Sequence, residues 1–154
     1  VINEFGIQAM STFWLANPEP GTHDLIITWT GRPNLQGTTI ITVRDTAGLD
    51  TGGGASNATS FGSSASPDIS VTTSQNNELI LDSVYDVNEI PIIPGDQFEI
   101  ATINPGAFHQ STSYKSWATA GATTMARAFT QPTSSDLMVI SMKPVDFIPQ
   151  ILII

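Results

Sequence analysis

The sequence has no cysteine among its 154 residues. This absence excludes disulfide scaffolds, zinc fingers, iron–sulfur clusters and thiol nucleophiles. It leaves secretion open, because a domain of this size buries enough surface to fold without disulfides. Apolar runs of about 18 residues, the length that spans a membrane as a helix, are also missing. We therefore expect no membrane insertion.

Positive charge is scarce as well. Charged residues make up 12% of the chain, and the 5 basic residues against 14 acidic ones give a formal net charge of −9. Nucleic acids and anionic membrane surfaces are bound through clustered lysine and arginine. The charge balance therefore excludes nucleic acid as an expected partner.

The residues that are abundant favour strands and turns. The chain has 34 serines and threonines, 18 isoleucines, 12 glycines and 10 prolines. Threonine and isoleucine suit a pleated sheet, whereas glycine and proline interrupt it at turns such as Asn17–Gly21 and Ile93–Asp96. No segment keeps a 3.6-residue apolar period for three turns. We predict an all-β protein, an antiparallel β-sandwich of jelly-roll type with about nine short strands.

The predicted strands are short segments with alternating or β-branched residues, bounded by turn residues. In one of them Leu25, Ile27 and Trp29 share a face, and in another Met125 alternates with Arg127 and Phe129. The predicted strands are Ile7–Leu15, Asp24–Thr30, Thr38–Arg44, Ile69–Thr73, Leu79–Tyr85, Gln97–Ile103, Ser113–Ala118, Thr123–Thr130 and Leu137–Met142.

Two stretches fall outside this pattern. Gly48–Pro67 consists mainly of small and polar residues and is predicted to be a long surface loop.

The second stretch is an apolar C-terminal tail at residues 145–154, which follows a β-sandwich domain at residues 1–144. An exposed tail of this kind favours aggregation unless it is paired. It either adds as a strand to a neighbour's sheet or folds back as the last strand of its own sandwich. The candidate assembly residues are Phe147, Ile148, Ile151, Leu152, Ile153 and Ile154.

Catalytic signals are weak. Asp50-Thr51-Gly52 matches the tripeptide of aspartic proteases, whose chemistry needs two carboxylates about 3 Å apart. A single copy would require a symmetric dimer, and the flanking residues are typical of a loop, so we interpret the tripeptide as a turn. The two histidines, His23 and His109, accompany no Gly-x-Ser-x-Gly motif. We predict that the protein is not an enzyme and has neither catalytic residues nor a cofactor.

Metal-binding patterns are equally weak. Two distant histidines without cysteine do not form a zinc site. Asp82, Asp86 and Glu89, or Asp45 and Asp50, could supply some oxygen ligands to calcium, but neither group matches an EF-hand loop. A solvated acidic edge is the simpler interpretation. We predict no metal site.

Exposed aromatic rings on β-sandwiches can stack on sugars, and two residues are candidates for such a glycan-binding site. Tyr114 and Trp117 are three positions apart, so they point to opposite faces of a regular strand. At most one of them can line an outer platform while the other fills the core.

The segment Phe13–Trp29 carries a resemblance to a known family. It consists of a predicted aromatic-rich strand, the sequence Asn17-Pro18-Glu19-Pro20-Gly21-Thr22-His23, and a second predicted strand whose side chains alternate between two faces up to Trp29. This pattern resembles a β-sandwich domain recurrent in phage virion proteins and bacterial surface proteins. The segments Thr123–Thr130 and Leu137–Pro144, which end on a Lys-Pro pair, are similar to the end of that domain.

The resemblance implies a decoration, fibre or adhesion module without catalytic residues. The apolar tail departs from the family pattern and favours a role in assembly. We therefore expect a non-enzymatic structural subunit or surface module of a virion or extracellular assembly, located in the virion or at the cell surface. Its expected partner is another copy of itself or another structural protein of the same assembly. The alternative is a carbohydrate-binding or adhesin module.

Overall fold

The computed structural model describes residues 2–5, 8–11, 13, 15, 19–28, 37–50, 57–86, 88, 92–106, 108–145 and 150–152. This part of the chain contains strands and no helix, so the predicted all-β class is confirmed and no helix of the described residues could cross a membrane. The strands are β1 (Ile2–Phe5), β2 (Gln8–Ser11), β3 (Thr42–Arg44), β4 (Thr46–Leu49), β5 (Asn57–Ser64), β6 (Asp68–Thr73), β7 (Glu78–Asp86), β8 (Ile92–Pro94), β9 (Phe98–Ile103), β10 (His109–Trp117), β11 (Gly121–Phe129), β12 (Thr133–Pro144) and β13 (Gln150–Leu152).

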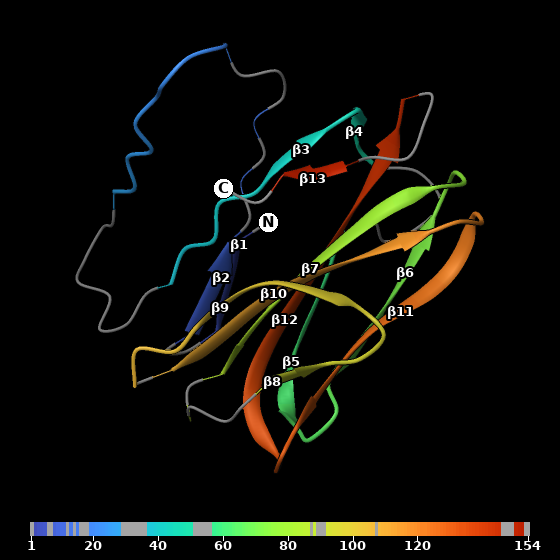
Figure 1. Ribbon diagram of the computed structural model, residues 1–154. Coiled ribbons are helices and arrows are strands. Elements are labelled where there is room, and N and C mark those ends of the chain that lie inside the picture. Colours follow the sequence, from blue (N-terminus) through green and yellow to red (C-terminus); the bar gives the residue numbers. More distant parts are fainter. Residues whose placement is uncertain are drawn as a thin grey trace.

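Nine of these strands form two antiparallel sheets (Figure 1). The larger sheet has the order β4-β12-β7-β10-β9, and β5 pairs with the same edge of β12 as β4 does. The smaller sheet has the order β6-β11-β8. Two separate ribbons, β1–β2 and β3–β13, complete the described strands. The predicted sandwich of about nine strands is thereby confirmed, whereas its jelly-roll connectivity stays a prediction.

The main core lies between the two sheets. Met125 and Phe129 of β11 are buried together with Arg127, while Thr124 on the opposite face is exposed, so the predicted alternation of this strand is confirmed. Each fully buried aliphatic or aromatic side chain stabilises the fold by about 1.5–3 kcal/mol. The core side chains are Ile69, Val71, Ile80, Val84, Ile92, Met125, Phe129, Leu137 and Val139.

A smaller apolar cluster covers the outer face of the larger sheet. Leu79, Leu81 and Met142 form its buried centre. Ile41 and Val43, from the segment that leads into and through β3, pack against it. Ile41 and Val43 therefore cover part of the outer face, and Tyr114 of β10 packs against the same cluster.

The predicted surface loop at Gly48–Pro67 is wrong for much of its length. β4 runs to Leu49, and β5 occupies Asn57–Ser64, where it pairs with Thr133–Ile140 of β12. Strand propensity depends strongly on the neighbouring strand, here β12, so a composition typical of turns does not exclude a strand. Residues 51–56 lie outside the described residues.

The predicted strand at Asp24–Thr30 is wrong for its described part. Residues 24–28 form no strand, and Leu25 and Ile27, predicted to share one face of it, are 62% and 45% exposed. In Figure 1 the blue segment that contains them lies away from both sheets. Alternation specifies a strand only where a neighbouring edge pairs with it. Trp29 and Thr30 lie outside the described residues.

The apolar tail is paired within its own chain. Gln150–Leu152 forms β13, which pairs antiparallel with Thr42–Arg44 of β3. Phe147, Ile148, Ile153 and Ile154 lie outside the described residues. The described part of the tail, Gln150–Leu152, therefore folds back onto its own chain, which is one of the two predicted alternatives. It pairs with β3 in a separate ribbon and not with the sandwich sheets.

Candidate functional site

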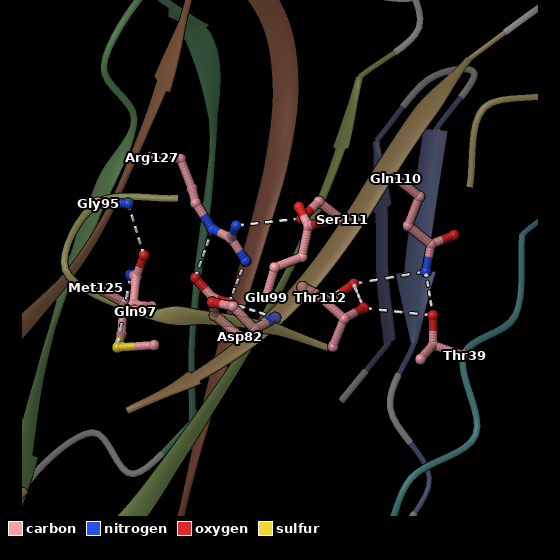
Figure 2. A network of polar contacts seen from close by, with 12 residues as sticks. Thr39, Asp82, Gly95, Gln97, Glu99, Gln110, Ser111, Thr112, Met125 and Arg127 are labelled. Carbon is pink, nitrogen blue, oxygen red and sulfur yellow. Dashed lines mark hydrogen bonds and ion pairs between the residues drawn. The ribbon is translucent and has the colours of Figure 1, made fainter. Parts of the chain in front are cut away.

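A buried ion pair connects the two sheets (Figure 2). Arg127 on β11 faces Asp82 on β7, and both side chains are fully shielded from solvent. Arg127 Nε donates to Asp82 Oδ2 at 2.9 Å, and Nη2 donates to Oδ1, so the contact is bidentate. Asp82 Oδ1 also accepts from the Ser113 amide at 3.1 Å and from its hydroxyl at 2.6 Å. The charge is therefore both paired and hydrogen-bonded, as a buried charge requires.

The network continues from the ion pair to the edge of the larger sheet. Arg127 Nη1 donates to Ser111 Oγ at 3.2 Å, and the Ser111 hydroxyl donates to Glu99 Oε2 at 3.2 Å. On the opposite face of β10, Gln110 and Thr112 lie within hydrogen-bond distance of Thr39 (Figure 2). These contacts attach the segment before β3 to the sheet. The network thus has a structural role, and its charged centre is closed to solvent.

A second polar cluster lies where β4, the end of β12 and the β6–β7 turn meet. Asp50 and Glu78 are both fully buried and share one donor, the Ser74 amide, at 2.8 Å and 2.9 Å. The Ser74 hydroxyl donates to Asp50 Oδ1 at 2.8 Å, and the Gln75 amide donates to Glu78 Oε1 at 2.7 Å. Lys143 Nζ lies 3.1 Å from Asp50 Oδ1. We call Asp50, Glu78 and Lys143 the carboxylate–lysine cluster.

Burial raises the pKa of Glu78 above its ordinary value of 4.5. The neighbouring charge of Asp50 also raises this pKa, while the amides of Gln75 and Ser74 and the Ser141 hydroxyl act to lower it. Burial likewise raises the pKa of Asp136 from 3.8. For Tyr85, burial and then the charges of Asp86 and Asp136 raise the pKa from 10.0.

The raised carboxyl pKa values predict that the free energy of unfolding decreases as the pH rises. A carboxyl group whose pKa is raised in the folded state binds its proton more tightly there than in the unfolded chain. The free energy of unfolding therefore falls as the pH rises from the pKa of the unfolded chain, near 4.5 for Glu78, to the higher pKa of the folded chain. The loss is about 1.4 kcal/mol for each unit by which the two pKa values differ. Urea unfolding at pH 4.5 and pH 8 measures the difference. Glu78→Gln should flatten the dependence, and an unchanged slope in that variant would contradict the role of Glu78.

The candidate glycan-binding residues lie on different faces, as their spacing predicts. Tyr114 borders the outer apolar cluster and stacks on Phe98, with ring centroids 5.3 Å apart. Phe98 itself is 65% exposed. Trp117 packs against the main core, and Lys115 Nζ lies 4.9 Å from its ring centroid. On the larger sheet, Phe98 and Tyr114 therefore form an aromatic pair at the surface, and the sequence did not indicate Phe98 because the pairing of β9 with β10 was not known.

An apolar surface lies on the segment that precedes the sandwich strands. Its members are large hydrophobic side chains outside both sheets, with exposed fractions between 45% and 88%. We call this set the exposed apolar segment: Phe13, Leu15, Leu25, Ile26, Ile27 and Ile40. Leu25, Ile26 and Ile27 are consecutive, and a monomeric soluble protein rarely exposes a large contiguous apolar patch. This surface is the strongest candidate for a functional contact.

The acidic groups considered as calcium ligands have other partners. Asp82 is paired with Arg127, Asp50 with Lys143, and Asp86 accepts a hydrogen bond from the Thr133 hydroxyl. Within the described part of the chain, no three histidine, cysteine or carboxylate side chains lie together as a metal site would require. Glu89 lies outside the described residues.

Comparisons with known proteins give no relative. No family model matches the sequence, and no curated protein or solved structure matches it significantly. The proposed function therefore rests on the surfaces of the described residues.

Proposed function

We propose that the chain is a non-enzymatic structural subunit or surface module of a virion or extracellular assembly, and that it associates through sheet edges and apolar segments. The observation that carries this proposal is the exposed apolar segment beside a sandwich that already has a complete core. Its six large side chains are each 45–88% exposed. Association would bury them.

Sheet edges supply the second kind of contact. Within the described residues β9 pairs only with β10, and β6 and β8 each pair only with β11, so these three strands present free edges. An extended apolar segment from another copy can add to such an edge, with backbone hydrogen bonds giving affinity and side chains giving specificity. Gln150–Leu152 of the tail pairs with β3 in a ribbon that is separate from both sandwich sheets.

The tail is tested by removing it. A chain that ends at Pro144 keeps all nine sandwich strands but lacks β13. The proposal predicts that the full chain forms discrete oligomers and that the shortened chain has a lower mass by light scattering after size exclusion. If both chains are monomers and the shortened one melts at a lower temperature, β13 serves only its own fold and the assembly role of the tail is wrong.

A second candidate function is glycan binding, which the Phe98–Tyr114 stack favours. One face of Tyr114 is covered by Phe98, whose ring is mostly exposed and available to stack on a sugar. On a glycan array, Phe98→Ala should reduce any signal at least tenfold. Trp117→Phe, which changes a ring packed against the core, is the matched control. A glycan signal that Phe98→Ala leaves unchanged would place the binding elsewhere.

A further inference from the structure

We propose that Lys143 and Asp50 condense to an intramolecular amide, so that β12 and the end of β4 become covalently joined, with Glu78 transferring protons in the reaction. This inference concerns the carboxylate–lysine cluster. It does not depend on whether the chain assembles. The bond would give a cysteine-free chain a covalent link between two strands of its larger sheet.

The reacting groups are already in contact. Lys143 Nζ lies 3.1 Å from Asp50 Oδ1, so the nitrogen is in direct contact with the carboxyl group whose carbon it would attack. The backbone fixes this arrangement, because Lys143 pairs with Gly48 across the strands and the Asp50 amide donates to the Ser141 carbonyl at 2.9 Å. Holding two groups in this way raises their effective concentration to about 10⁵–10⁸ M. That increase favours a condensation which free amines and carboxylates do not undergo in water.

The cluster is largely shielded from water. Asp50 and Glu78 are fully buried, and the Lys143 side chain is 25% exposed. The reaction requires that a proton passes from the ammonium of Lys143 to the carboxylate of Asp50, and shielding from water lowers the cost of this transfer because it disfavours charged groups. Burial raises the pKa of Glu78, which favours the protonated form of this second carboxyl group.

One oxygen of Glu78 is available for proton transfer. Oε1 accepts from the Ser74 and Gln75 amides, whereas Oε2 is buried without a hydrogen bond of ordinary geometry to any described residue. The buried Ser141 hydroxyl lies near enough to influence the pKa of Glu78, yet it too makes no hydrogen bond of ordinary geometry within the described residues. Oε2 is therefore the oxygen from which Glu78 can give and take a proton.

The reaction balances without an oxidant or an added reagent. Lys143 Nζ attacks Cγ of Asp50, and the Glu78 carboxyl group donates a proton to the carboxyl oxygen that leaves. The bond between Cγ and that oxygen breaks, and the oxygen departs as water. Glu78 recovers its proton from the nitrogen, which keeps one hydrogen in the new amide. The ammonium and carboxylate of the starting pair are thereby converted into one amide and one water molecule.

The experiment is the mass of the intact, denatured chain, purified as a folded species and incubated before analysis. We expect a mass lower than that of the sequence by one water molecule, and a branched peptide joining Lys143 to Asp50 after proteolysis. Lys143→Arg, which keeps the charge but forms no such amide, should retain the full mass. Glu78→Gln should slow the loss of water at least tenfold, and circular dichroism establishes that each variant is folded. Because the link closes a long loop, the linked chain should melt on the order of 10 °C above Lys143→Arg.

Three results would overturn the proposal. The first is a folded wild-type chain of full mass with a linear Lys143 peptide. The second is a water loss that persists in Lys143→Arg, which would indicate a cyclic imide at an aspartate instead of a cross-link. The third is an unchanged rate in Glu78→Gln, which would remove Glu78 from the reaction.

Discussion

Replacing Arg127 by methionine is expected to lower the free energy of unfolding by about 3–5 kcal/mol. The substitution keeps most of the length of the side chain but leaves the Asp82 carboxylate buried without its cation. Since a domain of this kind is stable by about 5–15 kcal/mol, the loss removes a large part of the total. Urea unfolding followed by tryptophan fluorescence measures it.

The control for this prediction is the ion pair at the surface. Lys115 contacts Asp96, whose side chain is 69% exposed, so Asp96→Asn should cost about 1 kcal/mol or less. Replacing both members of the buried pair, as in Arg127→Met with Asp82→Leu, should cost less than Arg127→Met alone, because no unpaired charge remains. A loss below about 1 kcal/mol for Arg127→Met would show that the buried ion pair does not hold the sheets together.

Replacing Leu25, Ile26 and Ile27 together by serine is expected to weaken association by about a hundredfold or more. Burial of apolar area contributes about 25 cal/mol per Å², so three large side chains in an interface account for several kcal/mol before ordering costs. These side chains are exposed in the single chain and lie outside the core, so the melting temperature of the monomer should stay nearly unchanged. Sedimentation equilibrium measures the dissociation constant.

The matched control changes polar residues of the same segment. Thr22→Ser with Thr28→Ser alters two exposed positions that flank the apolar ones and should leave association unchanged. Added salt should strengthen association of the unmodified chain, because it screens the repulsion between copies that each carry a net charge of −9. If the serine variant associates as strongly as the unmodified chain, the exposed apolar segment is not the interface.

The fold class and most sandwich strands could be predicted because their side-chain pattern is local. Met125, Arg127 and Phe129 alternate with smaller residues, and this alternation alone places them on one face of β11. An arginine on such a face requires a partner, but the identity of that partner does not follow from the pattern. Asp82 lies 45 residues away in the sequence, and only the pairing of sheets across the core brings it to Arg127.

The carboxylate–lysine cluster could not be predicted for the same reason. Asp50 stands out in the sequence only as part of an apparent protease tripeptide, and nothing there relates it to Glu78 or Lys143. The three meet because β4 pairs with β12 so that Lys143 lies opposite Gly48, and because the β6–β7 turn, with Asn77 at a φ of 60°, presents the Ser74 amide to both carboxylates. Register and turn geometry of this kind are properties of the folded chain.

The measurement that tests the central claim most directly is the solution mass of the unmodified chain over a range of concentrations, by light scattering after size exclusion. The account predicts a mass that rises with concentration to a defined multiple of the single chain, and that stays at one chain in the Leu25, Ile26 and Ile27 serine variant. A chain that remains a monomer up to high micromolar concentration, in low and in high salt, would contradict it.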